Sequence, residues 1–155
     1  MPSRKVKSYL EKAGIDYEVL EHDPVYTAQE VAAASHVKGK ELAKAVMIKA
    51  DGDQYMLVMP ATRMINFEML KENLGKKNVS LAPEEEFTQI FPDCEMGAMP
   101  PLGKLYNIKV LLDKSILDDE EIVFNAGTHH DIIKISLDDY MKLENPEKAS
   151  FTTHI

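Results

Sequence analysis

Cysteine is almost absent from this sequence, since Cys94 is the only one among 155 residues. A single thiol excludes an internal disulfide framework and any metal site built from several cysteines. Long apolar runs are also missing, and none approaches the roughly 18 residues that suggest a membrane span. The basic start at Arg4 and Lys5 is followed by no apolar signal core. We therefore expect a cytoplasmic protein with no membrane partner.

Positive charge is in the minority, with 18 Lys and Arg against 26 Asp and Glu and a net charge of −8. Such a chain is unsuited to broad, non-specific binding of nucleic acid, and we expect no DNA partner. Local RNA contacts are compatible with it. Two groups of basic residues are candidates for such contacts, and the alternative is that each is simply a solvated face. The first group is Arg4, Lys5, Lys7 and Lys12, and the second is Lys71, Lys76 and Lys77.

Several catalytic signatures are missing. The chain has no phosphate-binding glycine loop, no dinucleotide fingerprint and no serine in a nucleophile-elbow context. Nothing near Cys94 in the sequence would lower its pKa, so a structural thiol is favoured over a nucleophile. The other potential metal ligands show no recognisable spacing with the His129-His130 pair, and we expect neither metal nor cofactor; these residues are His22, His36, Cys94 and His154.

Local patterns predict a mixed α/β (α+β) protein in a single domain over residues 1–155. Hairpin chemistry at Asp51-Gly52-Asp53 favours a mixed sheet over a purely parallel one. The segment after Asn145 is expected to be loose. Strands are predicted near residues 15–20, 44–49, 55–59, 79–81, 108–112, 121–124 and 132–135. Helices are predicted between Ser3 and Gly14 and near residues 28–35, 66–74, 84–90 and 136–144.

Lys44 opens an apolar strand and is the first candidate for chemistry. A lysine that faces a pocket there would be a fixed positive charge with little water to screen it. The alternative is a lysine at a strand end that points to solvent, and the position alone favours this second interpretation.

The segment from Gly97 to Gly103 is the second candidate. Its two prolines fix the backbone, and its glycines let the chain bend and approach another molecule closely. Such a loop can present backbone N–H groups to a developing oxyanion. It can equally be a stiff surface connection.

The segment from Asn125 to Asp131 is the third candidate and contains both His129 and His130. Adjacent strand residues point to opposite faces, so we expect only one of the two histidines to face any given pocket. A histidine that merely fills a polar position is the alternative.

The order of these segments resembles the YbaK family. The lysine and the glycine-proline segment are its more specific parts. In chain order the motifs are His22-Asp23-Pro24, Thr27-Ala28-Gln29-Glu30-Val31-Ala32, Lys44 at the start of a strand, Met59-Pro60-Ala61, Gly97-x-x-Pro100-Pro101-Leu102-Gly103, and Asn125-Ala126-Gly127 followed by histidines.

The resemblance implies a curved, barrel-like mixed sheet with helices packed around it. It also implies that Lys44, the loop at Gly97 and the turn from Gly127 to His130 meet around one pocket. The family includes free-standing deacylases and the editing domain inserted in many bacterial prolyl-tRNA synthetases. We therefore expect a trans-editing hydrolase that deacylates mischarged aminoacyl-tRNA at its acceptor end, with a prolyl-tRNA synthetase as a candidate partner.

On this hypothesis the catalytic residues are Lys44, Gly97 and His130. Lys44 would hold a phosphate or the ester carbonyl, backbone N–H groups near Gly97 and Ala98 would stabilise the oxyanion, and His130 would position water or contact the α-amino group. The expected substrate-binding residues are Thr27, Met47, Met64, Ala98, Pro100, Asn125, Gly127 and His129.

The resemblance also bears on the amino acid removed. Cysteine-specific relatives tend to carry a tyrosine near His22, where this chain has Leu20, and usually lack the histidine pair. These departures favour alanine or a similar small residue on tRNA(Pro). Two alternatives stay open, namely a module that binds charged tRNA or an amino-acid derivative without hydrolysis, and a hydrolase of another small ester or amide.

Overall fold

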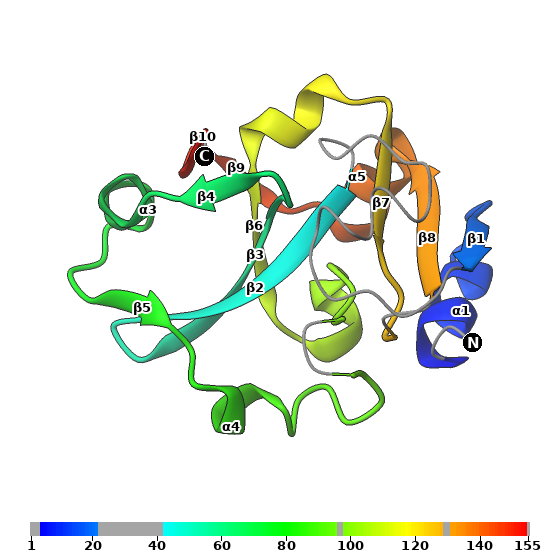
Figure 1. Ribbon diagram of the computed structural model, residues 1–155, viewed down its shortest axis with the longest axis horizontal. Coiled ribbons are helices and arrows are strands. Elements are labelled where there is room, and N and C mark those ends of the chain that lie inside the picture. Colours follow the sequence, from blue (N-terminus) through cyan, green and yellow to red (C-terminus); the bar gives the residue numbers. More distant parts are fainter. Residues whose placement is uncertain (1–3, 22–41, 96–97, 129–130, 155) are drawn as a thin grey trace.

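A mixed sheet of eight strands organises the chain in the computed structural model, which describes residues 4–21, 42–95, 98–128 and 131–154 (Figure 1). The strand order is β1-β8-β7-β2-β3-β6-β9, and β5 pairs with β2. The β2–β7, β3–β6 and β6–β9 pairs are parallel and the others antiparallel, which confirms the mixed sheet. Its strands are β1 (Glu18–Glu21), β2 (Leu42–Ala50), β3 (Asp53–Pro60), β5 (Val79–Leu81), β6 (Lys109–Asp113), β7 (Glu121–Asn125), β8 (Asp131–Ser136) and β9 (Glu147–Ala149).

A second sheet of two strands and several helices complete the described fold. The two strands are β4 (Arg63–Ile65) and β10 (Thr152–His154). The helices are α1 (Arg4–Lys12), α3 (Phe67–Leu74), α4 (Glu84–Phe87) and α5 (Leu137–Glu144), with 3₁₀ helices η2 (Gly103–Tyr106) and η3 (Lys114–Asp118). The helix expected near residues 28–35 lies outside the described residues, and the barrel-like curvature stays a prediction.

The β2–β3 hairpin forms where the sequence predicts it. Asp51 and Gly52 both have positive φ, 49° and 91°, and Ala50 pairs directly with Asp53. A two-residue turn with two positive φ angles matches the right-handed twist of the flanking strands. Because this turn fixes the register, it also determines which side chains of β2 share a face.

Apolar side chains pack on both faces of the sheet. On one face, Met47, Phe124 and Ile133 belong to the main core together with Leu10 of α1 and Tyr140 of α5. On the other face, a second cluster packs against α3 and the C-terminal segment; its buried members are Ile48, Leu57, Met59, Leu70, Leu111, Ala149 and Phe151. The edge of this face under β7 and β8 holds a small third cluster of Leu42, Ala61, Val123 and Ile132.

Local capping residues begin and end α3 as expected. The Asn66 side chain accepts a hydrogen bond from the Met69 N–H at 3.1 Å, and Gly75 ends the helix with φ 65°. A left-handed residue at this position favours glycine because a Cβ would be strained there. α3 is thereby held across the second apolar cluster, beside β4 (Figure 1).

The expectation of a loose C-terminal segment is wrong. Phe151 is fully buried, and its N–H donates to the buried carboxylate of Asp113 at 3.0 Å. The Thr152 hydroxyl donates to the same carboxylate at 2.9 Å. β9 and β10 have only three residues each, which is too short for an alternating pattern to show in the sequence.

Within the described ranges, every helix is too short or too polar to span a bilayer.

Candidate active site

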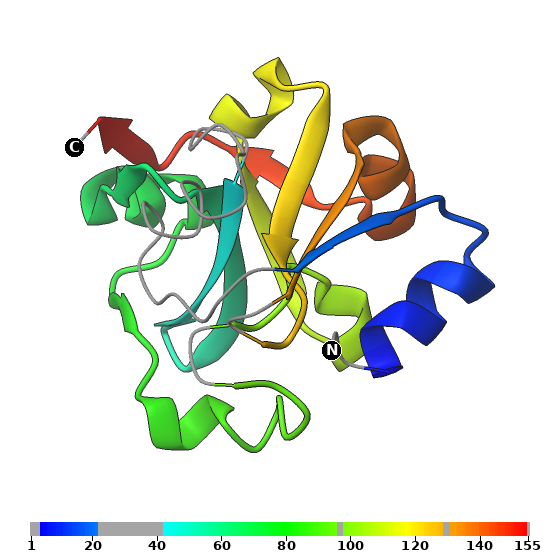
Figure 2. The ribbon, with the colours of Figure 1, turned by 45° about the vertical axis from the view of Figure 1, so that its right-hand side comes forward.

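The candidate site lies where β2 and β7 separate. Only two residue pairs join these parallel strands, Leu42 with Val123 and Ala43 with Phe124. Beyond them the strands diverge, as both ribbon views show (Figures 1 and 2). We call this place the β2–β7 fork. The divergence leaves the edge of β2 beyond Ala43 unpaired with β7, so the ladder between these two strands ends there.

Lys44 and Asn125 are the first residues beyond the paired segment. The side chains of Leu42 and Val123 belong to the same apolar cluster, so they share a face. Strand side chains alternate with a period of two, and Lys44 and Asn125 each lie two positions further on. The fork therefore places a lysine and a carboxamide on the same face of the sheet, each directly after the last paired residue of its strand.

The Lys44 ammonium has no anionic partner among the residues that the structure describes. Burial lowers the pKa of this ammonium from its ordinary value. The side chain as a whole is exposed, which limits the effect because water still reaches the charge. An unpaired, partly desolvated cation in this position attracts an anion or the oxygen of a polarised carbonyl.

The Asn125 side chain is also incompletely bonded. Its Oδ1 atom is buried and accepts no hydrogen bond within the described part of the chain. A buried acceptor without a donor costs about 1–3 kcal/mol. Such an acceptor is accordingly uncommon in a native structure, and a bound donor would remove the cost.

Glu95 and Ala98 are both hydrogen-bonded to Gly127. The Glu95 N–H donates to the Gly127 carbonyl at 2.7 Å, and the Gly127 N–H donates to the Ala98 carbonyl at 3.0 Å. Gly127 has φ 95°, a conformation that favours glycine. Since Gly127 follows Asn125 by two residues, both segments lie at the end of β7 that bounds the fork.

The proline-rich segment after Ala98 is anchored in the core. Pro100 and Pro101 are buried, and the Tyr140 hydroxyl donates to the Pro101 carbonyl at 2.6 Å. A Cβ at Gly103 would collide with the Val110 side chain and the Ile108 carbonyl. Its small size is therefore needed for packing. The two alternatives proposed for this segment are compatible, because a rigidly mounted loop can still present its tip to a ligand.

Some expected substrate contacts are not brought to the fork. Met47 is 2% exposed and lies in the main core on the opposite face from Lys44, because the two are separated by an odd number of strand positions. Met47 therefore does not lie on the face of the sheet that carries Lys44 and Asn125. Met64 lies on β4 with 51% of its surface exposed. The remaining candidates, Thr27, Gly97, His129 and His130, lie outside the described residues.

Of the backbone N–H groups expected near Gly97 and Ala98 to act as oxyanion donors, that of Ala98 already donates to the Glu95 carbonyl at 3.0 Å. The sequence analysis also missed the role of Thr128 and Asp131. The Thr128 hydroxyl donates to the buried Asp131 carboxylate at 2.8 Å and accepts from the Asp131 N–H at 3.1 Å. A threonine three residues before an aspartate, at the ends of a turn, was the available signal.

The other reactive groups of the described chain are structural. Burial raises the pKa of Cys94 to about 11, so little thiolate forms near neutral pH. Its Sγ lies 3.4 Å from the Tyr106 hydroxyl, which donates to Asp93 at 3.3 Å. No three His, Cys, Asp or Glu side chains gather as metal ligands in the described ranges.

Comparison with known protein families identifies the fold and its chemistry. A sequence model of the aminoacyl-tRNA editing domain matches residues 22–143, which is most of the chain. The chain belongs to the aminoacyl-tRNA editing domain family. The resemblance to YbaK proteins is thereby confirmed, and so is the expectation of a hydrolase that acts on the ester of aminoacyl-tRNA.

Individual relatives agree with this family. The chain is 27% identical over 156 aligned residues to the multifunctional Ser/Thr-tRNA deacylase ProXp-y of Escherichia coli K12, covering 96% of this chain and 91% of that protein. It is 25% identical to the prolyl-tRNA editing protein ProX of Acetoanaerobium sticklandii, covering 92% and 90%. The crystal structure of a candidate trans-editing enzyme for prolyl-tRNA synthetase superposes with a TM-score of 0.86 at 20% identity, over 97% and 96% of the chains.

The assignment to the editing-domain family indicates which reaction the residues of the β2–β7 fork have to be considered for, namely hydrolysis of an aminoacyl ester. Hydrolysis of an aminoacyl ester requires a placed water and stabilisation of the oxyanion, but no protein nucleophile. The absence of a reactive thiolate at Cys94 is consistent with such a reaction. The unpaired groups of Lys44 and Asn125 are, among the described residues, those best suited to meet a polar ester.

Proposed function

We propose that this editing domain removes a small amino acid, alanine or one of similar size, from mischarged tRNA(Pro), and that hydrolysis occurs at the β2–β7 fork. The observation that carries the proposal is the juxtaposition of an unpaired Lys44 ammonium and an unbonded Asn125 oxygen on one face of the sheet. Serine and threonine belong to the same size class, and one relative is named for these two.

Lys44 supplies positive charge where negative charge develops. The ester carbonyl becomes an oxyanion in the tetrahedral intermediate, and a cation with few competing anions stabilises it more than it stabilises the ground state. Alternatively the ammonium holds the phosphate of the terminal adenosine. In either role the charge matters because the surroundings of Lys44 are partly desolvated.

Backbone N–H groups remain candidates for a second oxyanion contact. The Ala98 N–H is already bonded, so this role passes to Gly97. Glu95 and Ala98, on either side of this candidate, are hydrogen-bonded to Gly127. Donors that are fixed before the reaction require little reorganisation during it. His130 is proposed to position the attacking water, and the ribose 2′-hydroxyl can assist.

Asn125 is proposed to bind a donor of the substrate. An aminoacyl-adenosine offers two suitable donors, the α-ammonium group and the free ribose hydroxyl. Either would satisfy the buried Oδ1 atom and remove the cost of leaving it unbonded. This free-energy cost is removed only when a substrate donor lies within hydrogen-bond distance of Oδ1. Asn125 therefore favours one orientation of the ester.

Selection of a small amino acid is proposed to depend on shape. The apolar surface under the fork consists of Leu42, Val123 and Ile132, with the small Ala61 beside them. A single methylene changes binding by only about 1–3 kcal/mol in an apolar pocket. Discrimination against larger residues therefore requires steric exclusion, and Thr27, His129 and Pro100 are the remaining candidates for its walls.

The test is release of labelled amino acid from a panel of charged tRNAs, including Ala-, Ser-, Thr-, Cys- and Pro-tRNA(Pro). Lys44→Ala is compared with Lys109→Ala, a matched exposed lysine on strand β6. Rapid release from one mischarged species, lost in Lys44→Ala and retained in Lys109→Ala, is the expected result. Binding of all species without release from any would instead indicate a non-hydrolytic module.

A synthetase partner is proposed from the name of a structural relative, a candidate trans-editing enzyme for prolyl-tRNA synthetase. The complex would place the editing domain where mischarged tRNA(Pro) leaves its synthetase. Co-sedimentation of the domain with prolyl-tRNA synthetase, with and without tRNA(Pro), tests it. Co-sedimentation in the presence of tRNA is expected, and separate sedimentation under both conditions would remove this part of the proposal.

A further inference from the structure

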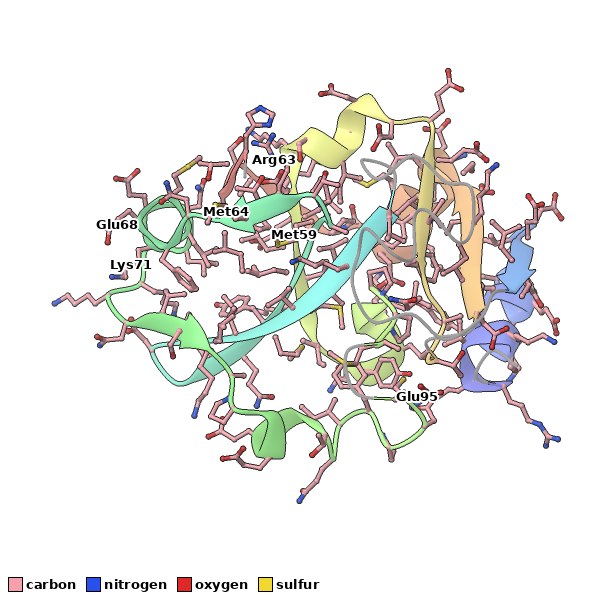
Figure 3. The ribbon with its side chains drawn as sticks, in the orientation of Figure 1. Met59, Arg63, Met64, Glu68, Lys71 and Glu95 are labelled. Atoms are coloured by element: carbon pink, nitrogen blue, oxygen red, sulfur yellow. The ribbon has the colours of Figure 1, made fainter. Side chains whose placement is uncertain are left out.

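Arg63 is held in a fixed position at the start of β4. Its Nε–H donates to the Thr152 hydroxyl at 2.6 Å, and a terminal N–H donates to the Thr152 carbonyl at 3.1 Å. The other terminal nitrogen lies 3.3 Å from the His154 ring. All of these partners are on β10, which pairs with β4. Figure 3 labels Arg63 close to Met64, its neighbour on β4. A guanidinium that is already oriented loses little entropy when it binds a ligand.

The buried carboxylate of Asp113 supports this orientation of the Arg63 side chain through Thr152. The Thr152 hydroxyl that accepts from Arg63 donates in turn to Asp113 at 2.9 Å. Asp113 and Thr152 are both buried, at 2% and 4% exposure, whereas Arg63 reaches the surface. The ionised Asp113 carboxylate can only accept, so the Thr152 hydroxyl donates its proton to Asp113 and accepts from Arg63, which gives the network one direction.

The Arg63 guanidinium forms no salt bridge with any described residue. Some other surface cations of the described chain do form ion pairs. Lys71 pairs with Glu68 at 3.6 Å, and Lys76 pairs with Asp53 at 3.4 Å. After its contacts with Thr152 and His154, the Arg63 guanidinium keeps N–H donors that can bind a phosphate, and it pairs with no carboxylate of the described residues.

The distance from Lys44 suits a nucleic acid bound at both places. Lys44 pairs with Met59, and Arg63 follows Met59 by four residues. A strand pair is about 5 Å wide and four residues span at most about 14 Å, so the two Cα atoms lie within about 20 Å. At about 3.4 Å for each stacked nucleotide, six nucleotides cover that distance.

We propose that Arg63 binds a backbone phosphate of the tRNA acceptor arm while the 3′-terminal ester occupies the β2–β7 fork. The inference rests on the proposed function for the position of the ester. It assigns Arg63 to recognition of RNA and not to the chemical step.

The test compares the only two arginines of the chain. Arg63→Gln and Arg4→Gln remove the same charge, but Arg4 lies on the exposed side of α1. Each variant is assayed on full-length mischarged tRNA and on a minimal aminoacyl-adenosine ester, which has no acceptor arm. Arg63→Gln should lower kcat/KM about tenfold on the tRNA and leave the minimal ester unchanged. Arg4→Gln should change neither.

Salt dependence gives a second readout, because each phosphate contact contributes nearly one unit to the slope of log affinity against log salt concentration. Arg63→Gln should lower that slope by about 0.9 for full-length tRNA. An equal loss of kcat/KM on both substrates, or no loss on either, would overturn the inference.

A direct measurement covers the case in which Arg63→Gln fails to fold. The two arginine Nε–H signals of the wild-type protein are distinguished by NMR with the Arg4→Gln variant. Addition of an uncharged acceptor-stem minihelix should shift the Arg63 signal, and an unshifted Arg63 signal in the RNA-bound protein would contradict the inference. This readout needs no hydrolysis, so failure of the proposed deacylase activity would be recognised separately.

Discussion

The β2–β7 fork and the surroundings of Asp113 differ in how completely their polar groups are hydrogen-bonded. At the fork, Lys44 and the Asn125 oxygen have no partner among the described residues. At Asp113, both carboxylate oxygens accept hydrogen bonds, from the Phe151 and Ser115 N–H groups and from the hydroxyls of Ser115 and Thr152. Burial by itself raises the pKa of Asp113, but these bonds together lower it below its ordinary value.

This difference separates groups that bind a ligand from groups that stabilise the fold. A satisfied buried carboxylate connects β6, η3 and the C-terminal segment, so its loss should affect folding. A buried polar group without a hydrogen-bond partner lowers stability unless a bound ligand supplies that partner. Substitutions at the two places are therefore expected to separate activity from stability.

The largest effect is expected at Lys44. Lys44→Met should lower the rate of deacylation about 100- to 1,000-fold, the range for loss of one oxyanion-stabilising group. The folded protein should be at least as stable as the wild type, because burial lowers the pKa of Lys44 and so disfavours its charged form. Single-turnover kinetics and urea unfolding measure the two quantities. Normal hydrolysis by folded Lys44→Met would refute its proposed role.

The next effect concerns stability at Asp113. Asp113→Ala should lower the free energy of unfolding by roughly 2–4 kcal/mol, because four donors lose their buried acceptor. Hydrolysis of the minimal ester per folded molecule should be unchanged. Asp118→Ala, at an exposed position in η3, is the control and should have little effect. An Asp113→Ala protein as stable as the wild type would show that Asp113 does not stabilise the fold.

A smaller effect on activity is expected at Asn125. Asn125→Ala should lower kcat/KM about tenfold, the value of one hydrogen bond to a charged donor, without loss of stability. Asn73→Ala should behave in the opposite way, since the Asn73 amide donates to the Met69 and Ser150 carbonyls at 2.8 Å. Thermal unfolding and kinetics measure the two effects. Equal destabilisation of Asn125→Ala and Asn73→Ala would contradict the proposed role of Asn125.

The smallest effect is a change in acid sensitivity. The folded pKa of Asp113 lies below its unfolded value of about 3.9, so its charge stabilises the protein above that pH. This stabilisation is lost as the pH falls through the folded pKa. Asp113→Asn should therefore flatten the decline of stability below about pH 4. An unchanged acid limb in urea unfolding curves would indicate that other carboxylates cause the decline.

Local signals in the sequence predicted much of this fold, and long-range pairing explains most of what was missed. The Asp51-Gly52 turn and the caps at Asn66 and Ser136 depend on neighbouring residues, and each lies where expected. The C-terminal segment was misjudged because its order comes from Asp113, nearly 40 residues away, rather than from any pattern of its own.

The candidate site shows the same limit. Lys44 could be selected from its position at the start of a strand, but its place on the same face as Asn125 depends on a parallel pairing between residues 81 positions apart. Met47 could have been excluded from the sequence, because strand alternation places it on the opposite face from Lys44. The bond that occupies the Ala98 N–H could not, since a loop hydrogen bond leaves no periodic pattern.

The location of the site is tested most directly by NMR of the protein with a non-hydrolysable aminoacyl-adenosine analogue. The Lys44 side-chain amine and the Asn125 side-chain amide should shift on binding, and the signals of residues around Asp113 should not. Binding of the analogue with Lys44 and Asn125 unchanged would contradict the placement of the editing site at the β2–β7 fork.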